Sequence, residues 1–225
     1  MSSSTNILPL YAPTFAPAAD DAAAEPAADG SLAWWKTTFD LTAASLLLVL
    51  AAPVLLLAAA AVKLTSAGPA FYSQVRVGAN GRRFVLWKLR SMRHNCEAAS
   101  GIRWATRRDP RVTPVGRFLR ASHIDELPQL FNVLRGEMSL VGPRPERPVF
   151  VRKFQKTIPN YMARHAVKCG MTGWAQVNGW RGNSSLRKRV QYDLYYITHW
   201  NPLFDLRILW LTVWHMLFGR QRHAY

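Results

Sequence analysis

The sequence predicts an α+β fold that is mostly helical: an apolar membrane helix joined to a compact cytosolic domain with a small β-hairpin and interfacial amphipathic helices. Three observations predict it. Residues 41–62 hold no charged side chain, and 22 such residues are long enough to cross a membrane. Two aromatic and β-branched runs flank an Asn-Gly pair, which is typical of a hairpin. Several later stretches repeat apolar residues at helical spacing.

The chain divides into three parts by composition. Residues 1–33 are rich in Ala, Pro, Ser and Asp and lack periodicity, which predicts a disordered tail. No basic segment precedes a hydrophobic core there, so a secretory signal is not expected. Residues 34–64 form the predicted membrane helix, and residues 65–225 are long enough for one domain.

Pro53 lies in the middle of the apolar run and predicts a kink. Two arrangements remain open: a kinked span, or a re-entrant helix that returns to the same face, while a helix buried in a protein core is the alternative to both. The excess of basic residues after the run favours a span with the tail outside, but Lys36 places a positive charge on the other flank too. Trp34 and Trp35 are expected to anchor the helix at the interface.

Charge is distributed unevenly along the chain. The net charge is +16, and the first 35 residues contribute four acidic and no basic residues, so the remainder carries +20. This predicts a polyanionic partner: nucleic acid, a phosphorylated substrate or an acidic membrane surface. Cys96 and Cys169 form no CxxC motif, and we expect both to be reduced in a cytosolic compartment.

Residues 70–77 and 82–92 are the predicted hairpin strands. Lys88 and Arg90 are two residues apart and therefore share one side of the second strand, where they either bind a ligand or face solvent. Residues 114–121 follow as a short helix that delivers Arg120 one turn before an acidic pair, Asp125 and Glu126.

A short helix is expected after this acidic pair and before Gly136. Its apolar face is predicted to be Leu127, Leu130, Phe131 and Leu134. Pro128 is tolerated in the first turn, which places Asp125 at the N-cap, where free N–H groups favour a carboxylate. Asp125 could serve only as a cap.

Three features favour a catalytic Asp125 instead. Glu126 has no helical ion-pair partner three or four residues on. The two acids are among only nine after residue 35, against 29 basic residues. A rigid Pro-Arg-Pro turn then presents Arg144 and Arg147. Phosphoryl transfer needs an anionic nucleophile surrounded by arginines, because the nucleophile must approach a phosphorus that is already negative.

The last third is predicted as amphipathic helices around one loop. Residues 148–156 and 160–168 are predicted to form two amphipathic helices. Their basic residues are expected to face either anionic lipid or water. These basic residues are Arg152, Lys153, Lys156, Arg164 and Lys168. Residues 169–182 read as a glycine-rich loop without an element, offering Gln176, Asn178 and Arg181 to a ligand. Residues 186–200 are helical, and 203–218 are too short for a span and predict an interfacial or buried helix.

Five motifs together resemble the bacterial sugar transferase family, whose members are polyprenyl-phosphate sugar-1-phosphate transferases, also called monotopic phosphoglycosyl transferases. The motifs are KLRSM at 88–92, DELPQ at 125–129, NVLRGEMSLVGPRP at 132–145, GMTGWAQVNG at 170–179 and YDLYY at 192–196. The resemblance covers about residues 34–218. It is to the small catalytic core of the family, without the additional spans and regulatory domain of the large members.

The resemblance implies a two-step reaction at the cytoplasmic face of the bacterial inner membrane. Asp125 would attack the β-phosphorus of a UDP-sugar, either UDP-glucose or UDP-galactose, and release UMP. Undecaprenyl phosphate would then take the sugar phosphate from the carboxylate, which is the initiating step of exopolysaccharide or glycoconjugate synthesis. Mg²⁺ would bind at Asp125 and Glu126, and Glu126 would assist catalysis. The hydrophobic segment would be a re-entrant hairpin broken at Pro53.

The expected substrate-binding residues combine the resemblance with the patterns above: Lys88, Arg90, Arg120, Arg144, Arg147, Gln176, Asn178 and Arg181. By resemblance, Lys88 and Arg120 lie near the phosphates and Arg144 near the nucleotide. The expected partners are a UDP-sugar, undecaprenyl phosphate and membrane lipids, with a homodimer left open and no nucleic acid. The alternatives are a membrane-tethered nucleic-acid-binding protein, whose salt-sensitive binding would not depend on Asp125, and a non-catalytic scaffold of the same pathway.

Overall fold

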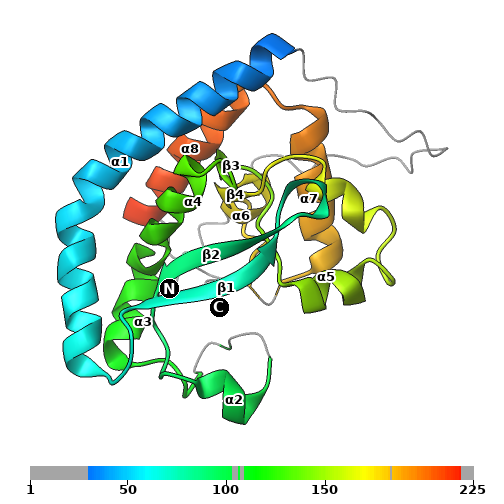
Figure 1. The fold of residues 1–225 in the computed structure, drawn as a ribbon. Coiled ribbons are helices and arrows are strands. Elements are labelled where there is room, and N and C mark those ends of the chain that lie inside the picture. The colour runs from blue at the N-terminus through cyan, green and yellow to red at the C-terminus, as the bar shows by residue number, and fades with distance from the viewer. Residues whose placement is uncertain (1–29, 103–105, 107–108, 183, 219–225) are drawn as a thin grey trace, which may run out of the picture.

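The computed structural model describes residues 30–102, 106, 109–182 and 184–218, and it is mostly helical, as predicted (Figure 1). The α-helices are α1 (Gly30–Thr65), α2 (Cys96–Ser100), α3 (Pro114–Ala121), α4 (Leu130–Leu134), α5 (Pro148–Phe154), α6 (Trp174–Val177), α7 (Leu186–Thr198) and α8 (Pro202–Leu217). Three short 3-10 helices are η1 (Ala79–Gly81), η2 (Ile124–Gln129) and η3 (Tyr161–His165). The strands are β1 (Phe71–Val77), β2 (Arg83–Leu89), β3 (Ser139–Val141) and β4 (Gly170–Thr172). The predicted tail lies outside the described residues, apart from residues 30–33, which begin α1.

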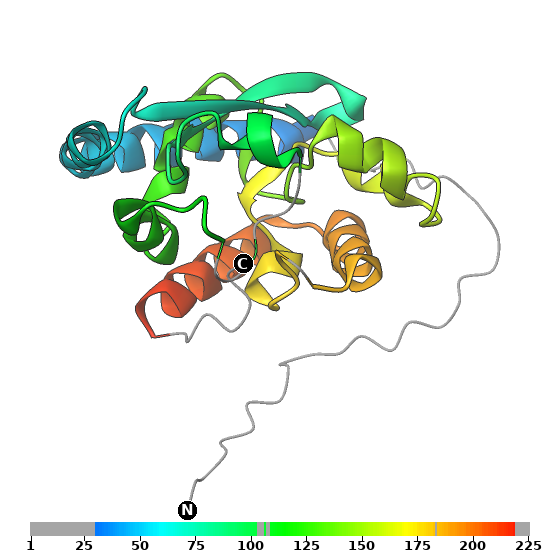
Figure 2. The same cartoon turned by 90° about the horizontal axis from the view of Figure 1, so that it is seen from below.

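The predicted hairpin is confirmed as β1 and β2, which pair antiparallel. Asn80 and Gly81 adopt φ values of 51° and 72° in the turn, the left-handed conformation that an Asn-Gly pair accepts at low cost. Tyr72 lies opposite Lys88 in the register, so these two side chains share one face of the sheet with Arg76, four residues on from Tyr72. Figure 2 shows the hairpin on one side of the domain and α6, α7 and α8 on the other.

The stretch 169–182 is not an element-free loop, and that prediction was wrong. It contains β4 and α6. β4 pairs parallel with β3, where Ser139 lies opposite Gly170. The backbones approach so closely that a Cβ on Gly170 would lie 2.1 Å from the amide nitrogen of Gly142. Glycine is required there because any side chain would collide with the neighbouring main chain.

We therefore expect Gly170→Ala to destabilise the fold by about 3 kcal/mol or more, since the clash is with backbone, which cannot move aside as a flexible side chain can. Urea unfolding monitored by tryptophan fluorescence measures the loss. Gly78→Ala is the control, because its Cβ would lie 3.2 Å from the Phe84 ring, and the backbone atom given for it, the Arg82 carbonyl oxygen, is at an ordinary contact distance of 3.7 Å. Equal stability of the Gly170 variant and the wild type would contradict the close approach of β3 and β4.

Helix α1 runs for 36 residues through Pro53 and bends in its middle (Figure 1), so the predicted kink is confirmed. Ala44 in the first half joins the same buried cluster as Ile208 of α8. Val62 in the second half is buried with Leu89 and Leu119. Both halves thus lie along one domain, diverging from the bend rather than packing against each other (Figure 1).

The opposite face of α1 is apolar and exposed. The large side chains exposed there include Leu46, Val49, Leu50, Leu56, Leu57 and Leu64. By length and composition α1 could cross a membrane. An exposed apolar face of this size is typical of a membrane or protein contact.

Lys36 is not a free charge on the flank of the apolar run, as the topology argument assumed. Its Nζ lies 2.6 Å from Oδ2 of Asp205 at the start of α8 and donates to the carbonyl of Val141 at 3.2 Å. Asp205 also accepts a hydrogen bond from the Tyr196 hydroxyl at 2.8 Å. These contacts fix the beginning of α1 to the domain, and the positive charge of Lys36 is neutralised.

The amphipathic helices are confirmed in part. Residues 160–168 contain only the five-residue η3, and Arg164 is 1% exposed rather than facing lipid or water. Its guanidinium pairs with Asp193 of α7, a partner that local sequence does not reveal. Helices α7 and α8 are confirmed. In α8, Ile208 is fully buried whereas Trp210 is 60% exposed, so this helix has one packed and one exposed apolar face.

Candidate active site

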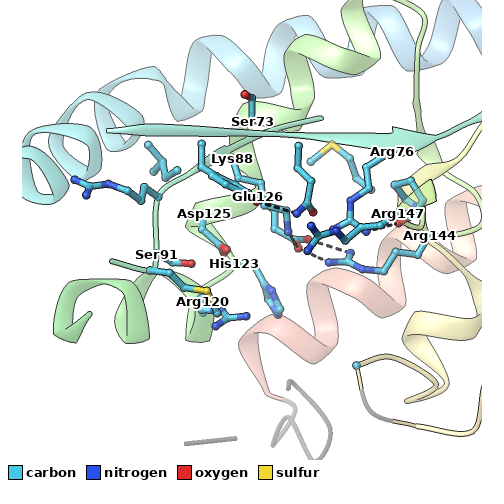
Figure 3. A pocket seen from close by; sticks show the side chains of 18 of the residues that line it. Ser73, Arg76, Lys88, Ser91, Arg120, His123, Asp125, Glu126, Arg144 and Arg147 are labelled. Atoms are coloured by element: carbon cyan, nitrogen blue, oxygen red, sulfur yellow. Dashed lines mark hydrogen bonds and ion pairs between the residues drawn. The ribbon is translucent and has the colours of Figure 1, made fainter. Parts of the chain in front are cut away.

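A cavity of about 780 Å³ lies among the hairpin, η2, α6 and α8. Its wall includes Lys88, Arg120, Asp125, Glu126, Arg144, Arg147, Gln176 and Arg181, together with part of Arg90. Figure 3 shows how Lys88 reaches Glu126 from the hairpin while Arg144 reaches it from the other side. Residues from three separate stretches of sequence, which hold Lys88, Glu126 and Arg144, therefore meet at one point of the cavity wall.

The acidic pair belongs to the 3-10 helix η2, so the prediction of Asp125 at an N-cap was wrong. The residue before η2 is His123, which has φ 60°. α4 begins only at Leu130, after Pro128. Because a 3-10 turn holds three residues instead of 3.6, the apolar stripe changes direction at this junction. Phe131 is consequently 46% exposed, although it was expected to be buried.

Asp125 is 5% exposed. Burial raises the pKa of its carboxyl to about 6, against the opposing effect of Lys88 and Arg120. No described residue donates a hydrogen bond to this carboxylate. The group is desolvated and open towards the cavity, which are the properties of a reactive carboxylate.

Both carboxylate oxygens of Glu126 are in contact with cationic side chains. Lys88 Nζ lies 2.6 Å from its Oε1, and Arg144 donates to both carboxylate oxygens, with Nη1 at 3.3 Å from Oε2. Burial alone would raise the pKa of Glu126, but Arg144 and Lys88 hold it well below its usual range. Burial lowers the pKa of Lys88, and Glu126 opposes that shift. Two adjacent carboxyl groups therefore have pKa values displaced in opposite directions, which is typical of groups with different catalytic tasks.

Two further cations in the wall, Arg120 and Arg181, have no carboxylate partner among the described residues, whereas Arg147 has one. Nη1 of Arg120 is buried and has no hydrogen-bond partner among the described residues. Arg181 Nη1 lies 3.5 Å from Nε2 of His123. Arg147 is paired with Glu97, with Nη1 at 2.7 Å and Nη2 at 2.9 Å from the two carboxylate oxygens. A buried guanidinium nitrogen without a partner indicates that an anion completes the site.

Three of the predicted binding residues have other contacts. Arg90 donates to the carbonyls at the end of α1, including Ser66 at 2.9 Å, and so holds α1 to β2. Asn178 donates to the carbonyl of Trp174 at 2.7 Å and is not part of the cavity wall. Gln176 donates to the carbonyl of Met171 at 3.0 Å, while its Oε1 is buried without a partner among the described residues.

Among the wall residues that sequence reasoning missed are Arg76 and His123. Arg76 could have been found, because strand alternation places it on the same face as Tyr72, opposite Lys88. His123 gave no signal, since its left-handed backbone, which turns the chain into η2, depends on the 3-10 geometry.

Residues 31–219 match the family model described as bacterial sugar transferase. A relative from Escherichia coli K12, named UDP-glucose:undecaprenyl-phosphate glucose-1-phosphate transferase, is 48% identical over 182 residues, covering 79% of this chain and 39% of the relative. A relative of the same name from Caulobacter vibrioides is also 48% identical, over 79% of this chain and 68% of its own length.

A third relative, from Aeromonas hydrophila, is named UDP-N-acetylgalactosamine-undecaprenyl-phosphate N-acetylgalactosaminephosphotransferase. It is 43% identical over 83% of this chain and 44% of its own length. The chain spans about two fifths of the length of the Escherichia coli relative. Since the family model covers most of the chain, including every element of the cavity wall, this protein belongs to the bacterial sugar transferase family.

Proposed function

We propose that this protein transfers a sugar-1-phosphate from a UDP-sugar to undecaprenyl phosphate, giving undecaprenyl-diphosphate sugar and UMP. One observation supports the proposal most directly: Asp125 is a buried carboxylate without a hydrogen-bond partner among the described residues, and it faces a cavity in whose wall a guanidinium nitrogen of Arg120 is buried, also without a partner among those residues. The names of the relatives support the same two substrates.

The proposed chemistry proceeds through a covalent intermediate. A carboxylate oxygen of Asp125 forms a bond to the β-phosphorus as the bond to the bridging oxygen breaks, and UMP leaves with that oxygen. A phosphate oxygen of undecaprenyl phosphate then bonds to the same phosphorus, and the bond to Asp125 breaks. Lys88, Arg120 and Arg144 stabilise the charge on the transferring group. The removal of water from Asp125 by burial makes its carboxylate a stronger nucleophile.

Magnesium fits this site through Asp125. The Asp125 carboxylate is open, and Mg²⁺ typically takes one or two carboxylates together with substrate phosphate oxygens. Glu126 is the weaker ligand, because Lys88 and Arg144 already occupy its oxygens. No group of three His, Cys, Asp or Glu side chains suitable for a metal occurs in the described part of the chain, so phosphate oxygens would complete the coordination. Bound Mg²⁺ would neutralise charge on the diphosphate.

UDP-glucose is the donor that we propose first, since more relatives are named for glucose than for N-acetylgalactosamine. The buried Oε1 of Gln176 would accept a hydrogen bond from a sugar hydroxyl, because its amide nitrogen is already held by Met171.

The proposed location is the cytoplasmic face of the inner membrane. The exposed apolar faces of α1 and α8 would lie in the bilayer. Because both halves of α1 pack on the same domain, α1 would dip into one leaflet and return rather than cross. The exposed Arg152 and Lys153 of α5 would contact anionic head groups.

The test is release of UMP from UDP-glucose, UDP-galactose and their N-acetylated counterparts, with undecaprenyl phosphate and Mg²⁺. We expect turnover with UDP-glucose, and a phospho-sugar adduct on the peptide containing Asp125 when the donor is supplied alone, detected by mass spectrometry. Lipid product that accumulates without any adduct on that peptide would contradict the covalent step. No UMP from any of the donors would contradict the function.

A further inference from the structure

The turn that carries Arg144 is held by three arginines from different elements: Arg164 and Arg189 are buried, and Arg76 is half-buried. Arg164 of η3 donates from Nη2 to the carbonyl of Arg144 at 2.9 Å. Arg76 of β1 donates to the carbonyl of Pro145 at 3.1 Å. Arg189 of α7 donates from Nη1 to Oε1 of Glu146 at 2.8 Å. Three guanidinium groups from three elements therefore fix one turn that bears a cation of the cavity wall.

Arg164 is itself fixed by a carboxylate. Its Nε and Nη2 lie 2.9 and 2.6 Å from Oδ2 of Asp193 in α7. The side chain of Arg164 is fully buried and that of Asp193 is 2% exposed. Neither reaches the cavity wall, so these side chains can act on a substrate only through the residues that they hold.

Arg189 connects the turn to a second cation. Its Nη2 donates to the carbonyl of Gly182 at 2.6 Å, immediately after Arg181. Arg144 and Arg181 both line the cavity. Helix α7 therefore supplies Asp193 and Arg189, which fix the two segments that bear these cations.

Burial of this network is costly, because an ion pair removed from water recovers its desolvation penalty only with good geometry. Apolar side chains would stabilise such an interior as well or better. A guanidinium has donors in a rigid fork, however, and can hold a carboxylate and a backbone carbonyl at once. Arg164 uses its fork in this way, on Asp193 and on Arg144.

We propose that Arg164 and Asp193 are positioning residues, which hold the Arg144 side chain where it meets Glu126 and the incoming diphosphate. This inference rests on the proposed function. Displacement of a catalytic group by about 1 Å can cost on the order of 100-fold in rate, so loss of this network should reduce turnover even in variants that remain folded.

The test is a double-mutant cycle in the full-length protein, with Arg144→Ala as the second variant. Arg164→Lys keeps the charge but loses the fork. We expect it to lower kcat for UMP release about 10- to 100-fold. On the Arg144→Ala background, the same change should lower kcat less than about threefold, because the group that it positions is gone. Folded fraction is measured by circular dichroism and thermal unfolding.

Val190→Ala is the matched control. Val190 lies beside Arg189 in α7 and is 3% exposed, so its truncation loosens the helix without touching the turn. Its effect on kcat should be the same in both backgrounds. If the effects of Arg164→Lys and Arg144→Ala simply multiply, the positioning role is wrong. If Arg164→Lys does not fold, Asp193→Asn takes its place: it is combined with Arg144→Ala in the same cycle, and the same comparison of kcat tests the positioning role. A folded wild type that releases no UMP would count against the proposed function instead.

Discussion

Asp125→Asn should abolish turnover and at the same time stabilise the protein at pH 8. The amide cannot form the acyl-phosphate bond, so we expect kcat to fall by at least about 10⁴-fold. UMP release under saturating donor and acceptor measures the loss. The opposite sign of the two effects separates a nucleophile from a residue that merely supports the fold, whose loss would reduce both quantities.

The gain in stability follows from the pKa. Burial raises the pKa of the Asp125 carboxyl from 3.8 to about 6, so the folded protein binds this proton more tightly than the unfolded chain. The contribution to stability is fully present below pH 3.8 and is lost as the pH rises through 6. At pH 8 the buried charge therefore costs up to about 3 kcal/mol, which the neutral amide removes.

Urea unfolding at pH 8 and at pH 4 checks this expectation: the advantage of Asp125→Asn should be present at the first pH and vanish at the second. Asp109→Asn is the matched control. A hydrogen bond from Arg111 holds the pKa of Asp109 below its usual range, so its amide variant should lose stability at pH 8. An Asp125→Asn variant that is less stable than the wild type at pH 8 would show that the surrounding cations outweigh burial.

The pKa of Asp125 also determines where kcat/KM falls on the acid side of its pH profile. Because only the ionised carboxylate is nucleophilic, kcat/KM should fall with a slope of one as the pH drops below about 6. An acid limb near pH 4 would indicate that the carboxylate remains hydrated.

Local patterns predicted the elements whose contacts are local. The hairpin follows from Asn80-Gly81 and strand alternation, and the bend of α1 follows from Pro53. The β3–β4 pairing could not be predicted, because it joins three-residue strands some 30 positions apart through a glycine contact. The burial of Arg164 was equally hidden, since its partner Asp193 lies in a different helix.

The site was predicted at the level of residues but not of contacts. The motifs indicated Asp125, Glu126, Lys88 and Arg144, and the structure brings these four together. Residue spacing could not show which of the two carboxylates forms ion pairs, because its partners Lys88 and Arg144 belong to elements far away in the sequence. The contacts of Arg90 could not be predicted for the same reason: it donates to carbonyls at and just after the end of α1, far away in the sequence.

Glu126→Gln should produce the second-largest loss of activity, by a route different from that of Asp125→Asn. Glu126 is the counter-ion of Lys88 and Arg144. With an amide in its place, Lys88 and Arg144 repel each other. They are then no longer held where they stabilise the charge on the transferring group. Removal of one such element typically costs 10²- to 10³-fold, so we expect kcat/KM to fall by about that amount.

The shape of the pH profile identifies the cause. Burial lowers the pKa of Lys88, and Glu126 is the group that opposes this shift most strongly. In Glu126→Gln the pKa of Lys88 should therefore fall further, and Lys88 should lose its proton nearer to neutral pH. A lysine without its proton cannot stabilise the phosphates, so the alkaline limb of kcat/KM should move to lower pH while the acid limb, set by Asp125, moves less.

Glu97→Gln provides the matched control, since Glu97 lines the same cavity and is paired with Arg147 rather than with Lys88. We expect a loss of less than about tenfold, as for a single partly exposed ion pair, and an unchanged alkaline limb. If Glu126→Gln lowers the rate but leaves the limb where the wild type has it, Glu126 does not set the charge of Lys88. Its role would then lie in the placement of Arg144 alone, because that is its only other cationic partner among the described residues.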